Sequence, residues 1–134
     1  MIEFPRRWVL FDYVDSRGVN VIKEWLLTLE KTERAKLNRK LEMLERNGPD
    51  LATGLLAGTK LRHIDKIRVK GRVASRLMVC RGPINPQEEF TLLFGAKERD
   101  RKLVPPDAEQ RAENHRIEVE NNPRERRTLH ERVS

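Results

Sequence analysis

The sequence predicts a single α+β domain in which an N-terminal strand and a helical hairpin pack on an antiparallel sheet, followed by a C-terminal helix, with all of the helices on one face of the sheet. Three observations support this prediction. Apolar residues recur at helical spacing in the first third of the chain, strand-like runs separated by Gly or Pro turns fill the middle, and a proline-led helical segment follows. The chain has 134 residues, of which 37% are hydrophobic, enough for one modest core.

The first half of the chain carries the signals of a strand and two helices. Residues 8–14 are rich in aromatic and β-branched side chains, as in a strand, and the turn sequence DSRG follows at 15–18. Thr32 is the expected N-cap of a second helix, which the sequence NGP at 47–49 ends. An apolar stripe predicts a first amphipathic helix over 19–31, and the stripe consists of Val19, Ile22, Trp25, Leu26 and Leu29.

The second half predicts three strands, one helix and a tail. A leucine-containing loop at 50–59 comes first. Two prolines and Asp107 are typical of a helix start, which predicts a helix over 104–120. Because residues 121–134 are polar and charged, we expect a flexible tail after a single domain at 1–120. Gly or Pro turns join the strand-like runs into an antiparallel meander, with strands at about 61–69, 73–81 and 89–96.

The net charge of +7 comes from one segment of the chain. Residues 60–81 contain eight Lys or Arg and a single acid, Asp65, whereas basic and acidic residues balance in the rest. In the stretch KIRVKGRVASRLMVCRG, which begins at Lys66, the first cations alternate with Ile and Val, so a strand would place them on one face. A local basic stripe of this kind is typical of proteins that bind a polyanion. The alternative is a solvated strand face whose cations prevent edge-to-edge aggregation.

Other functional classes find less support in the sequence. No apolar run is long enough to span a membrane or to form a signal peptide. The one cysteine, Cys80, lies in an apolar run and cannot form an internal disulfide, which favours the cytoplasm and a buried thiol. No cluster of His, Cys and Asp has metal-site spacing and no glycine-rich phosphate loop is present, so we expect no metal or cofactor. Trp8 and Trp25 are expected in the core.

The order of elements and two segments carry a resemblance to a known family. The segments are GTKLRHIDKIRVKGRVASRLMVCRG at 58–82 and FTLLFGAKERDRKLVPPDA at 90–108. Within them, KLR leads into the basic strand, Arg76-Leu77 lies in the next strand, and an apolar strand runs into GAKER before a proline-containing helix start. These features resemble the RelE/HigB/ParE superfamily of bacterial toxins from type II toxin–antitoxin systems over about residues 8–116, and the phage-borne HigB-like branch is the most similar.

The resemblance implies a toxin that cleaves mRNA on the ribosome and is held inactive by an antitoxin encoded next door. In such toxins catalysis is metal-free: the 2′-hydroxyl attacks the adjacent phosphate and leaves a 2′,3′-cyclic phosphate. By motif position, the expected catalytic residues are Lys66, Arg68, Arg76 and Lys97. Further RNA-binding residues are expected at Lys60, Arg62, Lys70, Arg72, Arg81 and Arg99.

The general acid and base do not follow from the resemblance. Leu103 stands where well-known members have a tyrosine, and the one tyrosine, Tyr13, lies in the first strand. A lysine held among arginines, Lys66 or Lys97, is the replacement base that the chemistry suggests. Two histidines are further candidates for the base. His63 is expected at the edge of the core, and His115 lies in the last helix.

Two other functions remain open at this point. A ParE-like inhibitor of DNA gyrase would have the same fold, and the missing tyrosine favours it. The dense cationic face favours the ribosome-dependent toxin, because docking on a ribosome consists mostly of phosphate contacts. A phage-derived nucleic-acid-binding protein without catalysis is the third possibility.

Overall fold

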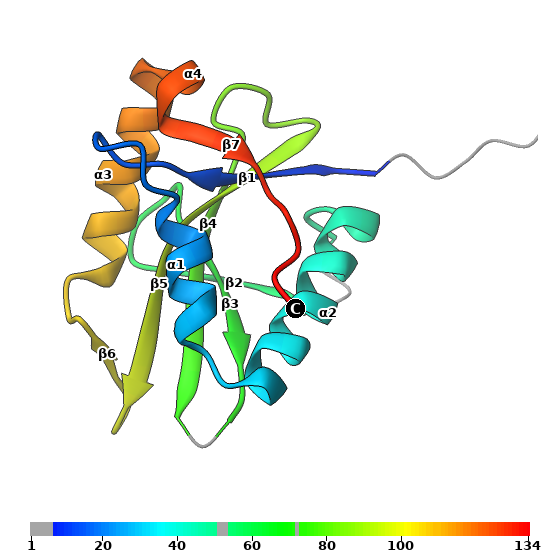
Figure 1. Cartoon of the computed structure of the whole chain (residues 1–134), viewed down its shortest axis with the longest axis vertical. Coiled ribbons are helices and arrows are strands. Elements are labelled where there is room, and N and C mark those ends of the chain that lie inside the picture. Colours follow the sequence, from blue (N-terminus) through cyan, green and yellow to red (C-terminus); the bar gives the residue numbers. More distant parts are fainter. Residues whose placement is uncertain (1–6, 51–53, 72) are drawn as a thin grey trace, which may run out of the picture.

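The computed structural model describes residues 7–50, 54–71 and 73–134. In these residues seven strands form one sheet in the order β2-β3-β4-β5-β1-β7, and β6 pairs with β5 outside that path (Figure 1). The strands are β1 (Val9–Tyr13), β2 (Leu56–Gly58), β3 (Asp65–Val69), β4 (Ala74–Arg81), β5 (Glu89–Arg99), β6 (Lys102–Val104) and β7 (Arg127–Leu129). The helices are α1 (Val21–Thr28), α2 (Lys31–Asn47), α3 (Ala108–Asn121) and α4 (Pro123–Arg126). The α+β class predicted from the sequence is confirmed.

The centre of the sheet is the predicted antiparallel meander of β3, β4 and β5. β1 lies beside the first half of β5 and runs parallel to it, so that Val9 is opposite Glu89 and Asp12 is opposite Leu92. A parallel pair needs a long connection between its strands, and here α1, α2 and the strands β2 to β4 lie between β1 and β5. The last part of β5 pairs with β6 instead, through a hairpin in which Lys97 is opposite Val104.

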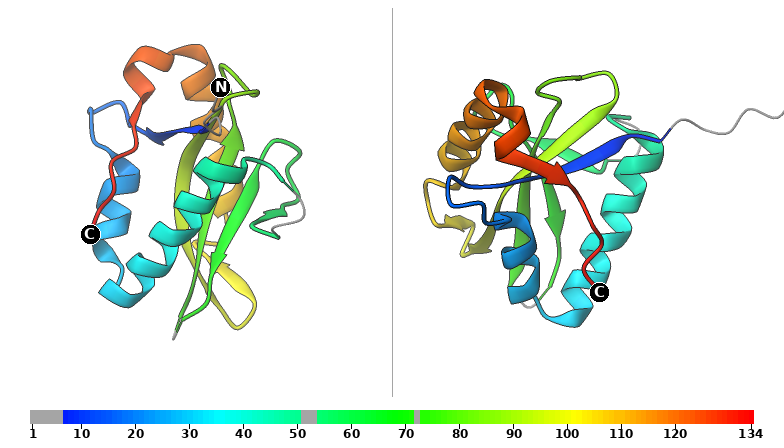
Figure 2. Two further views of the ribbon diagram at one scale, coloured as in Figure 1. Left: turned by 90° about the vertical axis from the view of Figure 1, so that its right-hand side faces the viewer. Right: turned by 45° about the horizontal axis from the view of Figure 1, so that its top comes forward.

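One face of the sheet packs against the helical hairpin of α1 and α2 (Figure 2). This main core includes Leu77 and Val79 of β4, which are fully buried together with leucines of both helices. Trp25 of α1 lies so close to Gly95 of β5 that a Cβ built there would be 1.9 Å from the Trp25 ring. Trp8 and Trp25 both pack against this cluster, as the sequence predicts.

The opposite face of the sheet is covered by α3, so the prediction that all helices lie on one face is wrong. Met78 and Cys80 alternate along β4 with the main-core residues, and they pack against Ala108 and Ala112 of α3. Alanines let the helix approach the strands closely. The sequence does not distinguish the two faces, because β4 and β5 are apolar on both sides.

Residues 121–134 are part of the folded body, in contrast to the flexible tail that their polarity predicts. They form α4 and β7, and β7 adds an antiparallel edge strand beside β1. The chain then continues toward α2, where Asn38 Nδ2 donates to the main-chain oxygen of Val133 at 2.9 Å (Figure 1). Main-chain pairing needs no apolar side chains, and Val133 alone packs on the main core. The polar composition of residues 121–134 therefore does not indicate that they pair with the sheet.

The ends of the first two helices differ in detail from the sequence prediction. Asn20 caps α1 by accepting a hydrogen bond from the Lys23 amide at 2.9 Å. Thr32 lies inside α2, whose N-cap is Glu30, so the predicted cap is wrong. Gly48, at φ 60°, ends α2 where the sequence predicts. The predicted loop at 50–59 contains β2, and its residues 51–53 lie outside the described residues. No helix in the described part of the chain has the length and apolar content needed to cross a membrane.

Candidate nucleic-acid interface

Strand β3 separates cations from apolar side chains, as its alternation predicts. Ile67 and Val69 are buried, at 0% and 1% exposure, and belong to the main core. Lys66 and Arg68 point to the other face, where Arg68 is exposed to solvent and Lys66 is partly exposed. Within residues 7–50, 54–71 and 73–134 neither of these two cations forms an ion pair. Both charges are therefore open to an anionic partner.

Arg76 lies directly opposite Arg68 in the β3–β4 ladder, on the same face. Like charges placed opposite each other destabilise a sheet, and Glu98 of β5 offsets this by forming an ion pair with Arg76. Arg76 also donates from Nη1 to the carbonyl oxygen of Ser75 at 3.0 Å. Only 12% of its side chain is exposed, so Arg76 is a rigid, partly neutralised cation at the centre of this face.

Lys97 points to the opposite face from Arg76, although the motif groups the two residues together. Ser75 is opposite Lys97 in the β4–β5 ladder, and Arg76 is opposite Ala96. Since neighbours along a strand alternate, Lys97 lies on the side of α2. There its Nζ is 3.3 Å from Ser75 Oγ and 3.4 Å from Glu33 Oε2. The four residues predicted to be catalytic thus divide into three on one face and one on the other.

A cavity of about 360 Å³ adjoins Lys66 on the cationic face. Lys60 and Lys66 line it together with Arg101 and Lys102, and its carboxylates are Glu98 and Glu109. Arg101 reaches this position because a tight turn joins β5 to β6, with φ of 66° at Arg101. Arg101 and Lys102 are not among the residues predicted from the sequence, since the predicted strand ends at residue 96. Leu103 also lines the cavity, so an aliphatic side chain stands at the position where the toxins that the sequence resembles have a tyrosine.

The remaining predicted RNA-binding residues lie around this face or beyond it. Arg62 and Arg81 line a second cavity of about 300 Å³ with Asp65, whose pKa is raised by burial and partly lowered again by Arg81. Lys70 is exposed at the end of β3. Arg99 lies beside Lys97 on the side of α2 and is therefore apart from the others. Arg72 lies outside the described residues.

The tyrosine and one histidine have environments that limit acid–base chemistry, whereas a second histidine is open to solvent. Tyr13 is 2% exposed and donates its hydroxyl to Glu118 at 2.8 Å, and burial raises its pKa strongly. His115 does reach the sheet, where Nδ1 is 2.8 Å from the carbonyl oxygen of Leu93, and burial lowers its pKa. His63 is exposed and lines the second cavity, so its expected place at the core edge is wrong.

Asp12 and His130 form a buried pair that the sequence does not predict. Their side chains are 2% and 6% exposed, and His130 Nδ1 is 2.8 Å from Asp12 Oδ1. The two residues are 118 positions apart, and only the pairing of β7 with β1 brings them together. Metal-ligating side chains do not gather in groups of three or more anywhere in the described residues. Cys80 is 1% exposed, which confirms the predicted buried thiol, and burial raises its pKa to about 12.

No family model, no curated protein and no solved structure matches this chain. The family resemblance therefore rests on the residues and on the order of the elements alone. What the fold adds is geometric: Lys66, Arg68 and Arg76 share one face of two paired strands, with a cavity at their side.

Proposed function

We propose that this protein is the toxin component of a type II toxin–antitoxin system and cleaves mRNA on the ribosome. The single observation that carries the proposal is the cationic face of β3 and β4. Lys66 and Arg68 have no ion pair in the described residues, and Arg76 is held rigidly between them and β5. Such a face binds the phosphates of a polyanion.

In the proposed reaction the 2′-oxygen of one nucleotide attacks the adjacent phosphorus, and the bond to the 5′-oxygen breaks. Arg68 and Arg76 stabilise the negative charge that develops on the phosphate oxygens. Lys66 lies two residues from Arg68 on this face. We propose that its uncharged amine is the base that removes the 2′-hydroxyl proton, and that the same proton then passes to the leaving 5′-oxygen. Lys97 faces α2, so we propose that it acts on the fold and not on the reacting phosphate.

The experiment is controlled expression in bacterial cells, followed by mapping of mRNA 5′ ends. We expect growth arrest with new 5′ ends inside translated regions, and rescue by the small protein encoded next door. Arg68→Ala should reduce cleavage, whereas Arg39→Ala should not, because Arg39 is an exposed arginine of α2, which packs on the other face. Failure of the neighbouring protein to form a stable complex on co-expression would contradict the antitoxin part of the proposal.

Two ion pairs favour a second candidate, a binding protein without catalysis. Arg76 is neutralised by Glu98, and Lys97 by Glu33, so half of the predicted catalytic cations already have carboxylate partners. Such a protein would either inhibit DNA gyrase or bind nucleic acid without cleaving it. If the protein inhibits DNA gyrase, DNA damage appears before any loss of mRNA. Early SOS induction with intact mRNA would therefore favour the gyrase inhibitor over the mRNA-cleaving toxin.

A further inference from the structure

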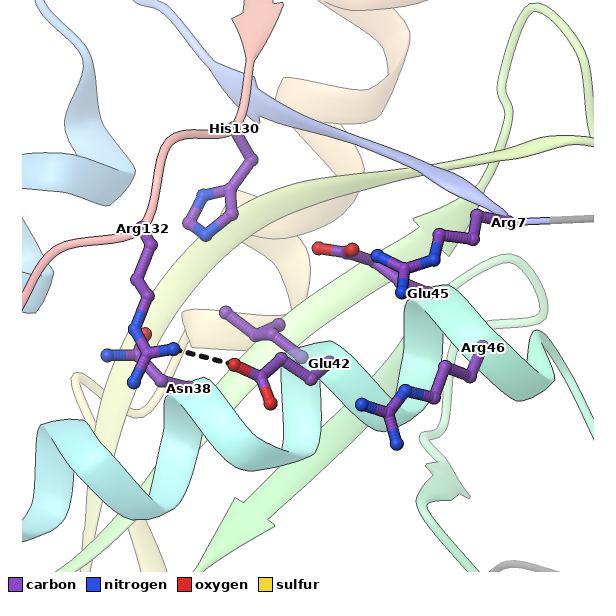
Figure 3. A pocket seen from close by; sticks show the side chains of 8 residues that line it. Arg7, Asn38, Glu42, Glu45, Arg46, His130 and Arg132 are labelled. Atoms are coloured by element: carbon purple, nitrogen blue, oxygen red, sulfur yellow. Dashed lines mark hydrogen bonds and ion pairs between the residues drawn. The ribbon is translucent and has the colours of Figure 1, made fainter.

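A cavity of about 340 Å³ lies between the start of β1, helix α2 and the C-terminal segment (Figure 3). Its size is within the range of small-molecule sites. Three arginines that are far apart in sequence line it, namely Arg7 before β1, Arg46 of α2 and Arg132 after β7. The cavity lies along α2, which packs on the face of the sheet opposite Lys66 and Arg68. It is therefore separate from the proposed RNA-binding face.

The imidazole of His130 is held in a fixed orientation at the wall of this cavity. Its Nδ1 is hydrogen-bonded to Asp12 Oδ1, while Asn20 Nδ2 donates a hydrogen bond to the other carboxylate oxygen of Asp12 at 3.0 Å. An imidazole oriented by a carboxylate in this way keeps its second nitrogen, Nε2, for another partner. Figure 3 shows the ring pointing into the cavity, and no hydrogen bond of Nε2 is found within the described residues.

The charged groups around His130 are only partly neutralised. Arg132 forms an ion pair with Glu42 at 2.7 Å, which fixes one side of the cavity. Arg7 and Arg46 are exposed and have no ion pair in the part of the chain that the structure describes. Glu45 contributes a carboxylate to the same cavity. Guanidinium groups bind phosphate oxygens in two places at once, whereas a carboxylate accepts hydrogen bonds from hydroxyl and amino groups.

We propose that this cavity binds a nucleotide. The phosphate contacts Arg7 and Arg46, a ribose hydroxyl donates a hydrogen bond to His130 Nε2, and Glu45 accepts a hydrogen bond from a base amino group. A free nucleotide and one nucleotide of an RNA strand offer the same chemistry. The ligand would join α2 to the C-terminal segment, so its binding would stabilise the fold. This inference does not depend on the function proposed above.

The test is calorimetric titration of the full-length protein with three probes: inorganic phosphate, uridine 5′-monophosphate and a short oligouridylate. Arg46→Ala should weaken binding about tenfold, the loss of one charge-assisted contact. The matched control is Arg39→Ala, which removes an exposed arginine of the same helix that does not line the cavity. His130→Asn should also weaken binding, while the thermal midpoint without ligand stays the same, since an asparagine amide can replace Nδ1 as the donor to Asp12.

Each outcome decides the proposal. Binding of the mononucleotide that Arg46→Ala weakens and Arg39→Ala does not supports a site for free nucleotides. The same pattern with the oligouridylate alone supports a site for one nucleotide of an RNA strand. Absence of binding for all three probes, or equal losses in Arg46→Ala and Arg39→Ala, overturns the proposal. It is also overturned if Arg68→Ala abolishes nucleotide binding and Arg46→Ala does not, because the ligand then lies on the sheet face.

Discussion

Replacing Arg76 by alanine separates the structural role of this residue from its proposed role in RNA cleavage. Arg76→Ala leaves Glu98 without its ion-pair partner, at a place where the two side chains are only 12% and 25% exposed. Breaking a fully buried pair costs about 3–5 kcal/mol, and partial exposure reduces this cost to about 2 kcal/mol. For a domain of this size such a loss lowers the thermal midpoint by about 6–10 °C.

The assay combines thermal unfolding with the rate of mRNA cleavage in four proteins: wild type, Arg76→Ala, Glu98→Ala and the double variant. Arg76→Ala should slow cleavage about 10²–10³-fold, as for the loss of one donor to a developing oxyanion. The double variant should recover about 1 kcal/mol of stability, because no unpaired carboxylate is left, but it should not recover cleavage. Glu98→Ala should keep its cleavage activity, since Arg76 is then free. Full cleavage in the double variant would refute the assignment of Arg76 to the reaction.

Three further predictions concern the fold. The free energy of unfolding should fall between about pH 9 and 12, because the pKa of Cys80 rises from 9.0 to about 12 on folding and only the unfolded thiol ionises in that range. The fall should be smaller in Cys80→Ala. A pH series of denaturant titrations measures both, and an equal fall in the two proteins contradicts the prediction. Gly95→Ala should cost about 1–3 kcal/mol in denaturant titrations, since its Cβ would meet the Trp25 ring at 1.9 Å. His130→Ala should cost about 2–3 kcal/mol in thermal unfolding, because buried Asp12 no longer accepts a hydrogen bond from the ring nitrogen. An unchanged thermal midpoint would contradict the buried Asp12–His130 pair.

Much of the fold follows from local patterns in the sequence. Alternation in KIRVK predicts which face of β3 is buried, and Ile67 and Val69 are buried there. Helical spacing predicts α1 and α2 with errors of a few residues at their ends. The position of α3 does not follow, because β4 carries apolar side chains on both faces, and nothing local distinguishes the side of Leu77 from the side of Met78.

The sequence reveals less of the candidate site, because long-range pairing decides it. Glu98 of the neighbouring strand neutralises Arg76, so an acid from outside residues 60–81 offsets part of the positive charge of that segment. The composition of the segment alone does not indicate this. Lys97 and Arg76 both lie in the segments that resemble the toxin family, but they face opposite sides of the sheet, which only the register of β4 and β5 reveals. No local sequence pattern predicts the contact between Asp12 and His130, because each is an isolated polar residue in the sequence and only the pairing of β7 with β1 brings them together.

The cationic face of β3 and β4 is the surface that we propose cleaves RNA, and the most direct test of this proposal is the chemistry of the RNA ends. Purified protein is added to translating ribosomes, and the termini of the mRNA fragments are determined for wild type, Lys66→Ala/Arg68→Ala and Arg39→Ala. We expect 2′,3′-cyclic phosphate ends with wild type and Arg39→Ala, and intact mRNA with Lys66→Ala/Arg68→Ala in a folded protein. Intact mRNA with the wild-type protein, or equal cleavage by the Lys66→Ala/Arg68→Ala variant, would contradict the claim.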